Sequence, residues 1–334
     1  MIPGIKATIA HTLDSIGLFD RASFGVRGRL IVFNYHRIRP NDPDFTTGFD
    51  PNVYGPTQDV FERQVEWLSR HRKILSEDDL LEAIERRKLP DERCSMITFD
   101  DGYRDNYDLA LPILKRYRVP ASFFIPTGLI ENRRLGWWDL ISYIVNRSSE
   151  HSIRYKGEHF ALNGNRSSVI QGFIRKMTLQ DAEATQDLVP ALTDLCRVEP
   201  PSRDLQDKEL MTWEQICEMA RSGMTIGSHT HTHPVLKTLP AKAQQSELGI
   251  SREILQGRTG QSIRSIAYPV GGRNHFTDCT KNLAKDCGYS VGYSFATGIN
   301  HTTHDSFNIR RVSGPQSLAF LAAKASFPVI FAQS

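Results

Sequence analysis

Apolar and polar positions along this chain of 334 residues alternate between the spacing of a buried strand and the spacing of an amphipathic helix. Residues 30–36, LIVFNYH, form a short apolar run rich in β-branched side chains, which predicts a buried strand that ends at His36. Residues 57–71, TQDVFERQVEWLSRH, instead repeat apolar side chains at helical spacing, and Thr57 is placed to cap that helix. Residues 76–87 show the same helical pattern.

The alternation continues after these elements. Residues 94–102, CSMITFDDG, predict a second strand that runs into two aspartates and a glycine, and residues 107–128 predict a helix, a break at Pro120 and a third strand. Helix and strand patterns alternate again over residues 212–298. Such an order predicts an α/β fold with a parallel sheet or barrel.

The pattern changes between about Glu131 and Met211. A helical stretch is followed there by polar, irregular sequence and then by a helix-like segment at 178–196, so we interpret this region as an insertion. We divide the chain into an N-terminal helix and linker (1–28), a main domain (29–320) and a C-terminal tail (321–334).

The sequences at the two ends of the chain indicate whether it contacts or spans a membrane. Apolar residues recur at helical spacing at Ile5, Ile9, Leu13 and Ile16. They predict a short amphipathic helix that packs on the domain, with contact to a membrane surface as the alternative. The N-terminus has no continuous apolar stretch typical of a secretory signal, and residues 317–334 are interrupted by Lys324 and Pro328. We therefore expect a cytoplasmic protein, with peripheral contact to the inner membrane as an alternative.

Charge and cysteine content exclude several classes of function. The 41 basic and 38 acidic residues leave a net charge of +3, which provides no strong field for a nucleic acid. The five cysteines are odd in number and widely scattered, so they indicate neither a disulfide framework nor a cysteine zinc site. A reducing compartment fits this pattern best.

Asp100 and Asp101 lie next to each other where the second strand ends. Neighbouring side chains point in different directions, so one carboxylate can bind a cation while the other faces a substrate. Two like charges this close repel each other unless a cation neutralises one of them. Because Asp-Asp-Gly is also a common turn, a solvated loop is the alternative.

The segment HTHTHP places three histidines within five residues. His229 and His233 are four residues apart and can reach one cation, while His231 between them is expected to point away. Two imidazoles and one carboxylate suit a borderline metal, zinc first, with cobalt or nickel as alternatives, and three protein ligands leave a position for water. Histidines that only pack at a strand end are the competing interpretation.

TFDDG at 98–102, H-T-x-x-H-P at 229–234 and AYPVG at 267–271 resemble, in that order, the motifs of the NodB-type polysaccharide deacetylases, the fourth family of carbohydrate esterases. The resemblance spans residues 29–312 and implies a distorted (β/α)7-type barrel. It also implies roles for individual residues, which are Asp100 as general base, Asp101, His229 and His233 as metal ligands, and the backbone N–H of Val270 as oxyanion donor.

Two departures from the family pattern leave residues to be assigned. Many members have an arginine two residues before the proline of the third motif, where this chain has Ala267, and Arg264, Arg310 or Arg311 could replace it. The sequence does not decide among these three arginines.

The second departure concerns the general acid. A leucine-x-histidine near the C-terminus usually supplies this acid, and this chain has no clean copy. NYHRI at 34–38 resembles exopolysaccharide-processing members, including poly-N-acetylglucosamine deacetylases, and this makes His36 our candidate for the acid, against a structural histidine at the barrel mouth. His301 and His304 fit an exposed loop better.

We assign substrate binding to Tyr268, Pro269, Trp138 and Arg311. The run Trp137, Trp138 and Asp139 can line a sugar site, because an aromatic face stacks on a pyranose ring, but paired tryptophans are as often part of a core.

The expected function is metal-dependent removal of N-acetyl groups from a polymeric, lipid-linked or nucleotide-linked sugar during exopolysaccharide or O-antigen assembly. Hydrolysis of a cyclic amide or imide on the same fold is one alternative. A non-catalytic carbohydrate-binding protein is the other.

Overall fold

The computed structural model describes residues 8–10, 12, 27–180, 187–301 and 305–331. The strands are β1 (Arg29–Tyr35), β2 (Arg37–Arg39), β3 (Tyr54–Thr57), β4 (Lys73–Ile74), β5 (Arg93–Phe99), β6 (Ser122–Ile125), β7 (Ser152–Tyr155), β8 (Glu158–Ala161), β9 (Thr225–Ser228), β10 (Ser265–Ala267), β11 (Val291–Tyr293) and β12 (Val312–Ser313). The helices are α3 (Gln58–His71), α4 (Glu77–Glu85), α5 (Leu111–Tyr117), α6 (Thr127–Asn132), α7 (Trp137–Arg147), α8 (Arg166–Leu179), α10 (Leu188–Cys196), α11 (Arg203–Glu209), α12 (Trp213–Arg221), α13 (Ala241–Thr259), α14 (Asp278–Asp286), α15 (Leu318–Ser326) and α16 (Pro328–Phe331). Three short helical segments are η1 (Pro51–Val53), η2 (Asn106–Ala110) and η3 (Leu236–Thr238).

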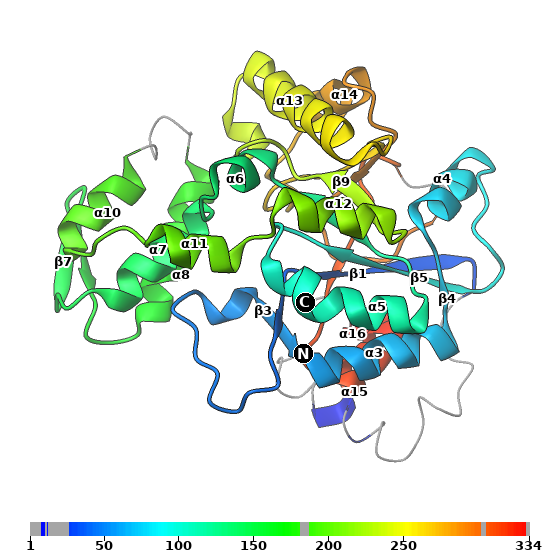
Figure 1. Cartoon of the computed structure of the whole chain (residues 1–334), viewed down its shortest axis with the longest axis horizontal. Helices are drawn as coiled ribbons and strands as arrows, with labels where there is room; N and C mark the ends of the chain where they lie inside the picture. The colour runs from blue at the N-terminus through cyan, green and yellow to red at the C-terminus, as the bar shows by residue number, and fades with distance from the viewer. Residues whose placement is uncertain (1–7, 11, 13–26, 181–186, 302–304, 332–334) are drawn as a thin grey trace.

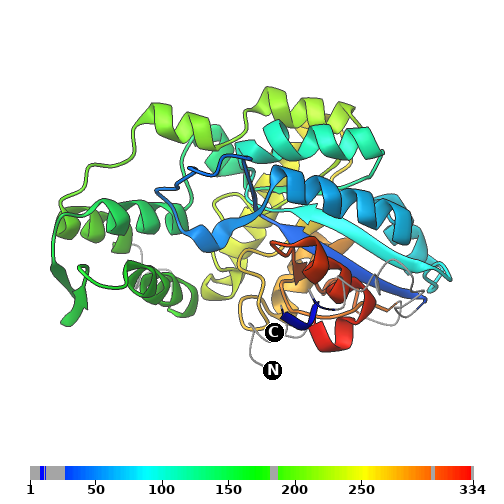
Figure 2. The same cartoon turned by 90° about the horizontal axis from the view of Figure 1, so that it is seen from below.

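A parallel sheet forms the centre of the molecule. Its strands follow the order β11-β10-β9-β6-β5-β1-β12, with β4 beside β5. A parallel bridge between Tyr293 and Ile309 connects β11 to the segment just before β12, so the sheet curls almost into a closed barrel. Helices cover its outside (Figures 1 and 2). The predicted parallel α/β architecture of the (β/α)7 type is confirmed.

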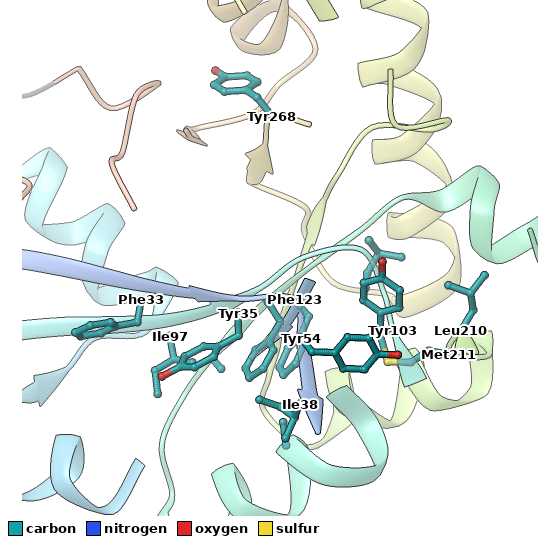
Figure 3. Packing of buried hydrophobic residues seen from close by; sticks show 14 of the residues in the cluster. Phe33, Tyr35, Ile38, Tyr54, Ile97, Tyr103, Phe123, Leu210, Met211 and Tyr268 are labelled. Carbon is teal, nitrogen blue, oxygen red and sulfur yellow. The ribbon is translucent and has the colours of Figure 1, made fainter. Parts of the chain in front are cut away.

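Alternate residues of the strands face two different parts of the core. On β1, Leu30 and Val32 belong to one apolar cluster, whereas Ile31, Phe33 and Tyr35 belong to a larger cluster that includes residues of the outer helices. Figure 3 shows Phe33 and Tyr35 projecting from the same side of the strand. Because both faces of the sheet are buried, the strand sequences are continuous apolar runs.

The smaller cluster lies inside the curled sheet. Phe124 on β6 and Tyr293 on β11 have ring centroids 5.0 Å apart, although β9 and β10 lie between their strands in the sheet. A Cβ at Gly227 on β9 would lie 2.5 Å from the ring of Phe124, so this position also faces the interior and has no room for a side chain. Side chains therefore fill the interior below the mouth of the barrel.

The helix starts expected from the sequence are largely confirmed. Ser76 and Asp79 form a capping box at the start of α4. Helix α3 begins after Thr57 as expected, but the Thr57 side chain makes no capping hydrogen bond to the helix backbone and bonds to Asp59 instead. The predicted capping by Thr57 is therefore wrong in its detail.

Residues 137–180 and 187–209 form a lobe beside the barrel, which we call the insertion lobe (Figure 1). It contains α7, the antiparallel hairpin of β7 and β8, α8, α10 and α11. Helix α8 occupies residues 166–179, where we expected irregular sequence. The single helix expected over 178–196 is wrong at its start, because α8 ends at Leu179 and the backbone of Gln180 is extended. Residues 181–186 lie outside the described residues, and the last part of the expected helix is α10.

The C-terminal boundary that we placed at residue 320 falls inside α15, which packs against α3. The predicted N-terminal amphipathic helix lies mostly outside the described residues, and of its four apolar residues only Ile9 is described, in a helical stretch and exposed. Among the described residues, no helix is both long and apolar enough to cross a membrane.

Candidate active site

The candidate residues meet at the carboxyl ends of the central strands. Asp100 follows β5, His229 follows β9 and Arg311 precedes β12, and each is less than 3% exposed. Strand alternation explains their common direction. Asp100 continues the inward positions of β5, and Arg311 shares the face of Ile309, which belongs to the interior cluster.

Asp101, His229 and His233 bring one ligand atom each to a single point. Asp101 Oδ1 lies 3.3 Å from His229 Nε2 and 3.4 Å from His233 Nε2, and the two Nε2 atoms lie 3.2 Å apart. All three residues are buried, and Asp101 Oδ1 has no well-aligned hydrogen-bond donor. A carboxylate and two imidazoles with converging lone pairs fit a divalent cation.

The hydrogen bonds around His229 favour the tautomer that binds a metal. Its Nδ1 lies 2.7 Å from the carbonyl oxygen of Ala267, which can only accept, so Nδ1 carries a proton and Nε2 presents a lone pair. Burial lowers the pKa of His233, which keeps that ring neutral as a ligand must be. Burial opposes protonation of His229 too, but Asp100 and Asp101 raise its pKa above the usual value, so protons compete with a cation for Nε2.

The loop that carries the histidines is held from outside the cluster. The carboxylate of Glu247 on α13 accepts hydrogen bonds from the backbone N–H of His231 (2.9 Å) and of Thr232 (2.8 Å). The ring of His231 contacts Thr127 Oγ1 at 2.9 Å and takes no part in the Asp-His-His cluster. The structure thus separates His231 from the other two histidines, as expected.

Asp100 is held by a buried arginine. Arg311 Nη1 donates to Asp100 Oδ1 at 2.8 Å and to Asn34 Oδ1 at 2.7 Å, and Asn34 Nδ2 donates to Asp100 Oδ2 at 3.1 Å. Burial alone would raise the pKa of Asp100, but Arg311 and the neighbouring imidazoles outweigh it and lower that pKa. Asp100 is therefore an ionised carboxylate that can act as a base.

Of the three candidate arginines, only one contacts the Asp100 carboxylate in the described part of the chain. Arg311 contacts Asp100, whereas Arg264 pairs with Asp78 on α4 and the backbone N–H of Arg310 donates to Asn300. The Arg311 guanidinium contacts Asp100 and Asn34 in a fully buried position, and its assignment to substrate binding stays a prediction.

His36 follows β1 and lies beside the same carboxylate. Its Nε2 is 4.0 Å from Asp100 Oδ2, and about a third of its side chain is exposed at the mouth. His301 contacts Arg29 at the opposite, N-terminal end of β1, and His304 lies outside the described residues.

Several site residues have an unusual backbone conformation. Asp101 (φ 75°), Thr230 (φ 65°), His233 (φ 60°) and Val270 (φ 58°) are all in the left-handed region, which is costly for residues with a Cβ and most of all for a β-branched one. Most of the other non-glycine residues with positive φ close helices or the β7–β8 turn.

These residues surround a cavity of about 360 Å³, which we call the mouth pocket. It is lined by His36, Asp50, Asn52, Val53, Asp100, Asp101, Trp137, Trp138, Gln171, Ile174, Thr178, His229, His233, Tyr268, Val270, Phe295 and Arg311.

Of the residues that we assigned to substrate binding, Trp138, Tyr268 and Arg311 line the mouth pocket and Pro269 does not. The Trp138 ring lies 4.2 Å from the His233 ring, and its Nε1 donates to Tyr103 Oη. The Tyr268 hydroxyl donates to the carbonyl oxygen of Phe307, so it is the ring of Tyr268 that faces the pocket.

Several residues of the site were not predicted from the sequence. Asn34 was visible as a polar residue in an apolar strand, although nothing indicated its contacts with Asp100 and Arg311. The carbonyl oxygen of Ala267 cannot be recognised from residue type. Asp50 and the three α8 residues of the pocket lie in segments that had no recognisable motif.

Comparisons with known proteins identify the family and support the fold. A family model described as polysaccharide deacetylase matches residues 87–292. The putative polysaccharide deacetylase YxkH of Bacillus subtilis is 24% identical over 253 residues, which cover 75% of this chain and 63% of the relative. The poly-beta-1,6-N-acetyl-D-glucosamine N-deacetylase of Staphylococcus epidermidis is 34% identical over 119 residues, which cover 34% of this chain and 41% of that protein.

The chain thus spans less than two thirds of the length of either relative. Among solved structures, the Streptococcus pyogenes deacetylase PplD in complex with acetate superposes with a TM-score of 0.57 at 20% identity, covering 86% of this chain and 93% of that one. This likeness supports the barrel fold. The family model covers more than half of the sequence, and the chain belongs to the polysaccharide deacetylase family.

Proposed function

We propose that this protein is a metal-dependent N-deacetylase that hydrolyses the acetamide of an N-acetylhexosamine unit to acetate and a free amine. The proposal depends on one observation. The ligand atoms of Asp101, His229 and His233 converge in the mouth pocket beside Asp100, a separate carboxylate that Arg311 holds ionised. A binding protein with no reaction to perform has no need of the second carboxylate.

Asp101, His229 and His233 would hold the metal, for which zinc is our first candidate. When bound, the metal supplies a Lewis acid for the acetamide oxygen and lowers the pKa of water in the site.

Asp100 would act as the base. Arg311 and Asn34 fix its carboxylate, and its Oδ2 faces the cluster at 4.0 Å from His229 Nε2. In this position the carboxylate can remove a proton from a water that attacks the carbonyl carbon. The backbone N–H of Val270 would stabilise the negative charge that develops on the carbonyl oxygen.

His36 would complete the reaction by giving a proton to the departing amine. It is the partly exposed histidine at the mouth, and its Nε2 lies 4.0 Å from Asp100 Oδ2, so both groups border the same space. The products are acetate and the deacetylated sugar.

The relatives suggest the kind of sugar. The Staphylococcus epidermidis relative is named for poly-beta-1,6-N-acetyl-D-glucosamine. We therefore propose an N-acetylglucosamine-containing saccharide of an exopolysaccharide or O-antigen pathway, either polymeric or linked to a lipid or nucleotide. All five cysteines are free, which supports a reducing compartment such as the cytoplasm.

Release of acetate from a panel of N-acetylated saccharides tests the proposal. We expect release that stops with a chelator and returns with zinc. Asp100→Asn should abolish turnover and still bind metal, while His231→Ala, in the same loop as the ligands, should keep both properties. Substantial turnover by Asp100→Asn would refute the base, and cleavage of cyclic amides with no acetate release would refute the substrate class.

A further inference from the structure

The insertion lobe supplies one wall of the mouth pocket. Gln171, Ile174 and Thr178 of α8 line the pocket and follow one another at intervals of three and four residues, so they form a single stripe on the helix. Trp137 and Trp138 at the start of α7 add to the same wall. The chemistry of the barrel is therefore bordered by residues that the barrel itself does not provide.

The other side of α8 anchors the helix within the lobe. Phe173 is fully buried, and its ring packs against Phe160 at 4.5 Å and against Tyr155 at 6.0 Å between centroids. Both partners belong to the β7–β8 hairpin. This packing fixes the rotation of α8 and keeps Gln171, Ile174 and Thr178 turned toward the pocket.

A guanidinium fixes α8 relative to α7. Arg166, the first residue of α8, donates to the carbonyl oxygens of Val145 (2.8 Å), Asn146 (2.6 Å) and Ser148 (2.8 Å), where α7 ends. Arginine at a helix C-terminus satisfies carbonyl groups that lack partners in the helix and complements the helix dipole. The two helices therefore form a rigid pair.

This helix pair is joined to the segment just before β3, which lies beside the lobe in both views (Figures 1 and 2). The contacts are Asn146 Nδ2 to the carbonyl oxygen of Gly48 at 3.2 Å, the Tyr143 ring to the Phe49 ring at 6.3 Å, and Gln171 Nε2 to Asp50 Oδ2 at 2.6 Å. Because Asp50 also lines the mouth pocket, the Gln171–Asp50 bond forms a polar bridge along the wall.

The Asp50 carboxylate has acceptor capacity left. It is 3% exposed, and its Oδ1 accepts hydrogen bonds from the backbone N–H of Asn52 (3.0 Å) and from Asn52 Nδ2 (2.8 Å). Its Oδ2 accepts from Gln171. An ionised carboxylate offers about four lone-pair sites, so roughly one remains on Oδ2 next to the pocket. A carboxylate oxygen held in this way suits a hydroxyl donor.

We propose that the insertion lobe determines sugar specificity, with the Asp50–Gln171 bridge binding one ring hydroxyl of the sugar whose acetamide lies at the Asp-His-His cluster. Ile174 beside the bridge contacts the apolar face of the same ring. The ligand class is a neutral N-acetylhexosamine with that hydroxyl in the orientation that reaches Asp50. This inference rests on the proposed deacetylase function.

Analogues that change one hydroxyl at a time provide the test. The wild-type protein, Asp50→Asn and Gln171→Ala are assayed for acetate release from N-acetylglucosamine oligosaccharides and from analogues of the reacting sugar that are epimeric at C3 or C4, or deoxy at C3, C4 or C6. A site built to bind a hydroxyl rejects the analogue that lacks it, so we expect the wild type to prefer the parent at one position by at least about tenfold in kcat/KM. In both variants the ratio of kcat/KM for the parent to kcat/KM for that analogue should be close to one, mainly because the KM for the parent is higher.

Arg175→Ala is the matched control, because Arg175 is exposed on α8 and does not line the pocket. It should leave the ratio unchanged. The proposal is overturned if both variants keep the wild-type ratio, or if they lose kcat equally on every analogue while thermal unfolding shows that they are folded. If Asp50→Asn does not fold, Gln171→Ala decides alone. Absence of acetate release from the wild type on every sugar would instead count against the deacetylase function.

Discussion

Replacing Arg311 with methionine would leave the carboxylate of Asp100 buried without its cation. The Arg311 side chain is completely buried, and its guanidinium donates to Asp100, to Asn34 and, at 3.0 Å, to the carbonyl oxygen of Ser294. Asn34 Oδ1 keeps another donor, Thr98 Oγ1 at 2.7 Å. The substitution therefore removes hydrogen bonding mainly from the Asp100 carboxylate, whose remaining side-chain donor is Asn34 Nδ2 at 3.1 Å.

The expected cost follows from the burial of the pair. Removing one partner of a buried ion pair destabilises a protein by about 3–5 kcal/mol, a large part of the roughly 5–15 kcal/mol that holds a typical domain folded. Arg311→Lys should lie between the wild type and Arg311→Met, because an ammonium keeps the charge but cannot reach acceptors on three sides as a guanidinium does. The double variant Asp100→Asn with Arg311→Met removes both charges and should be less destabilised than the sum of the single changes.

Urea unfolding followed by circular dichroism, with a chelator present throughout, measures these differences without a contribution from bound metal. Activity on the proposed substrate should fall by about 100-fold in Arg311→Met, because a base displaced by even 1 Å loses its alignment. A destabilisation below about 1 kcal/mol, or strict additivity in the double variant, would contradict the assigned pair, since breaking a buried pair costs more and coupled residues are not additive.

Three further changes test separate parts of the site. His229→Ala should lose bound metal and His231→Ala should keep it, as measured by metal analysis after dialysis. Asp139 is 1% exposed, and burial raises its pKa from 3.8 to about 7, so the folded state holds more protons than the unfolded state between about pH 4 and pH 7. Unfolding free energy should fall as pH rises through that window, by up to about 4 kcal/mol, and Asp139→Asn should flatten the slope in urea titrations; an unchanged slope would contradict the shift. Val270→Gly should raise the free energy of unfolding by about 1 kcal/mol, seen as a higher Tm, because glycine adopts the left-handed region without strain. A lower Tm would show that contacts of the valine side chain stabilise the fold more than its positive φ destabilises it.

The convergence of the two motifs could be predicted because it depends on local features. Asp100, Asp101 and His229 each follow a short apolar strand, and the carboxyl ends of parallel strands lie at one edge of a sheet. Two histidines four residues apart with a third between them already suggested which pair would meet. No long-range information was needed beyond the strand order.

The choice of Arg311 needed the register of the strands. Arg310 and Arg311 are neighbours, and only their alternation with respect to the barrel interior separates them. Ile309 lies in the interior cluster and Val312 in the outer one, so Arg311 shares the inward face of Ile309 and Arg310 faces the other way. From the sequence alone, either face of this short segment could have been the buried one.

The insertion lobe was harder to predict for a different reason. Helix α8 turns a partly polar stripe toward the mouth pocket, so its sequence lacks the clear contrast between an apolar and a polar face that reveals a surface helix. Its anchors, such as Arg166 on the end of α7, are contacts to backbone carbonyls and are invisible in residue patterns.

The location of the strained residues supports the proposed division of roles, with the reaction on the barrel and sugar recognition on the insertion lobe. Asp101, Thr230, His233 and Val270 all have positive φ, and each such residue costs about 1–2 kcal/mol, so the site needs a scaffold that over-determines its loops. Parallel strands and the Glu247 carboxylate provide that scaffold. Helix α8 carries no strained backbone, because all of its residues have negative φ. Its pocket stripe can therefore change side chains without straining the loops of the Asp-His-His cluster, as the proposed division between a reaction on the barrel and sugar recognition by the lobe requires.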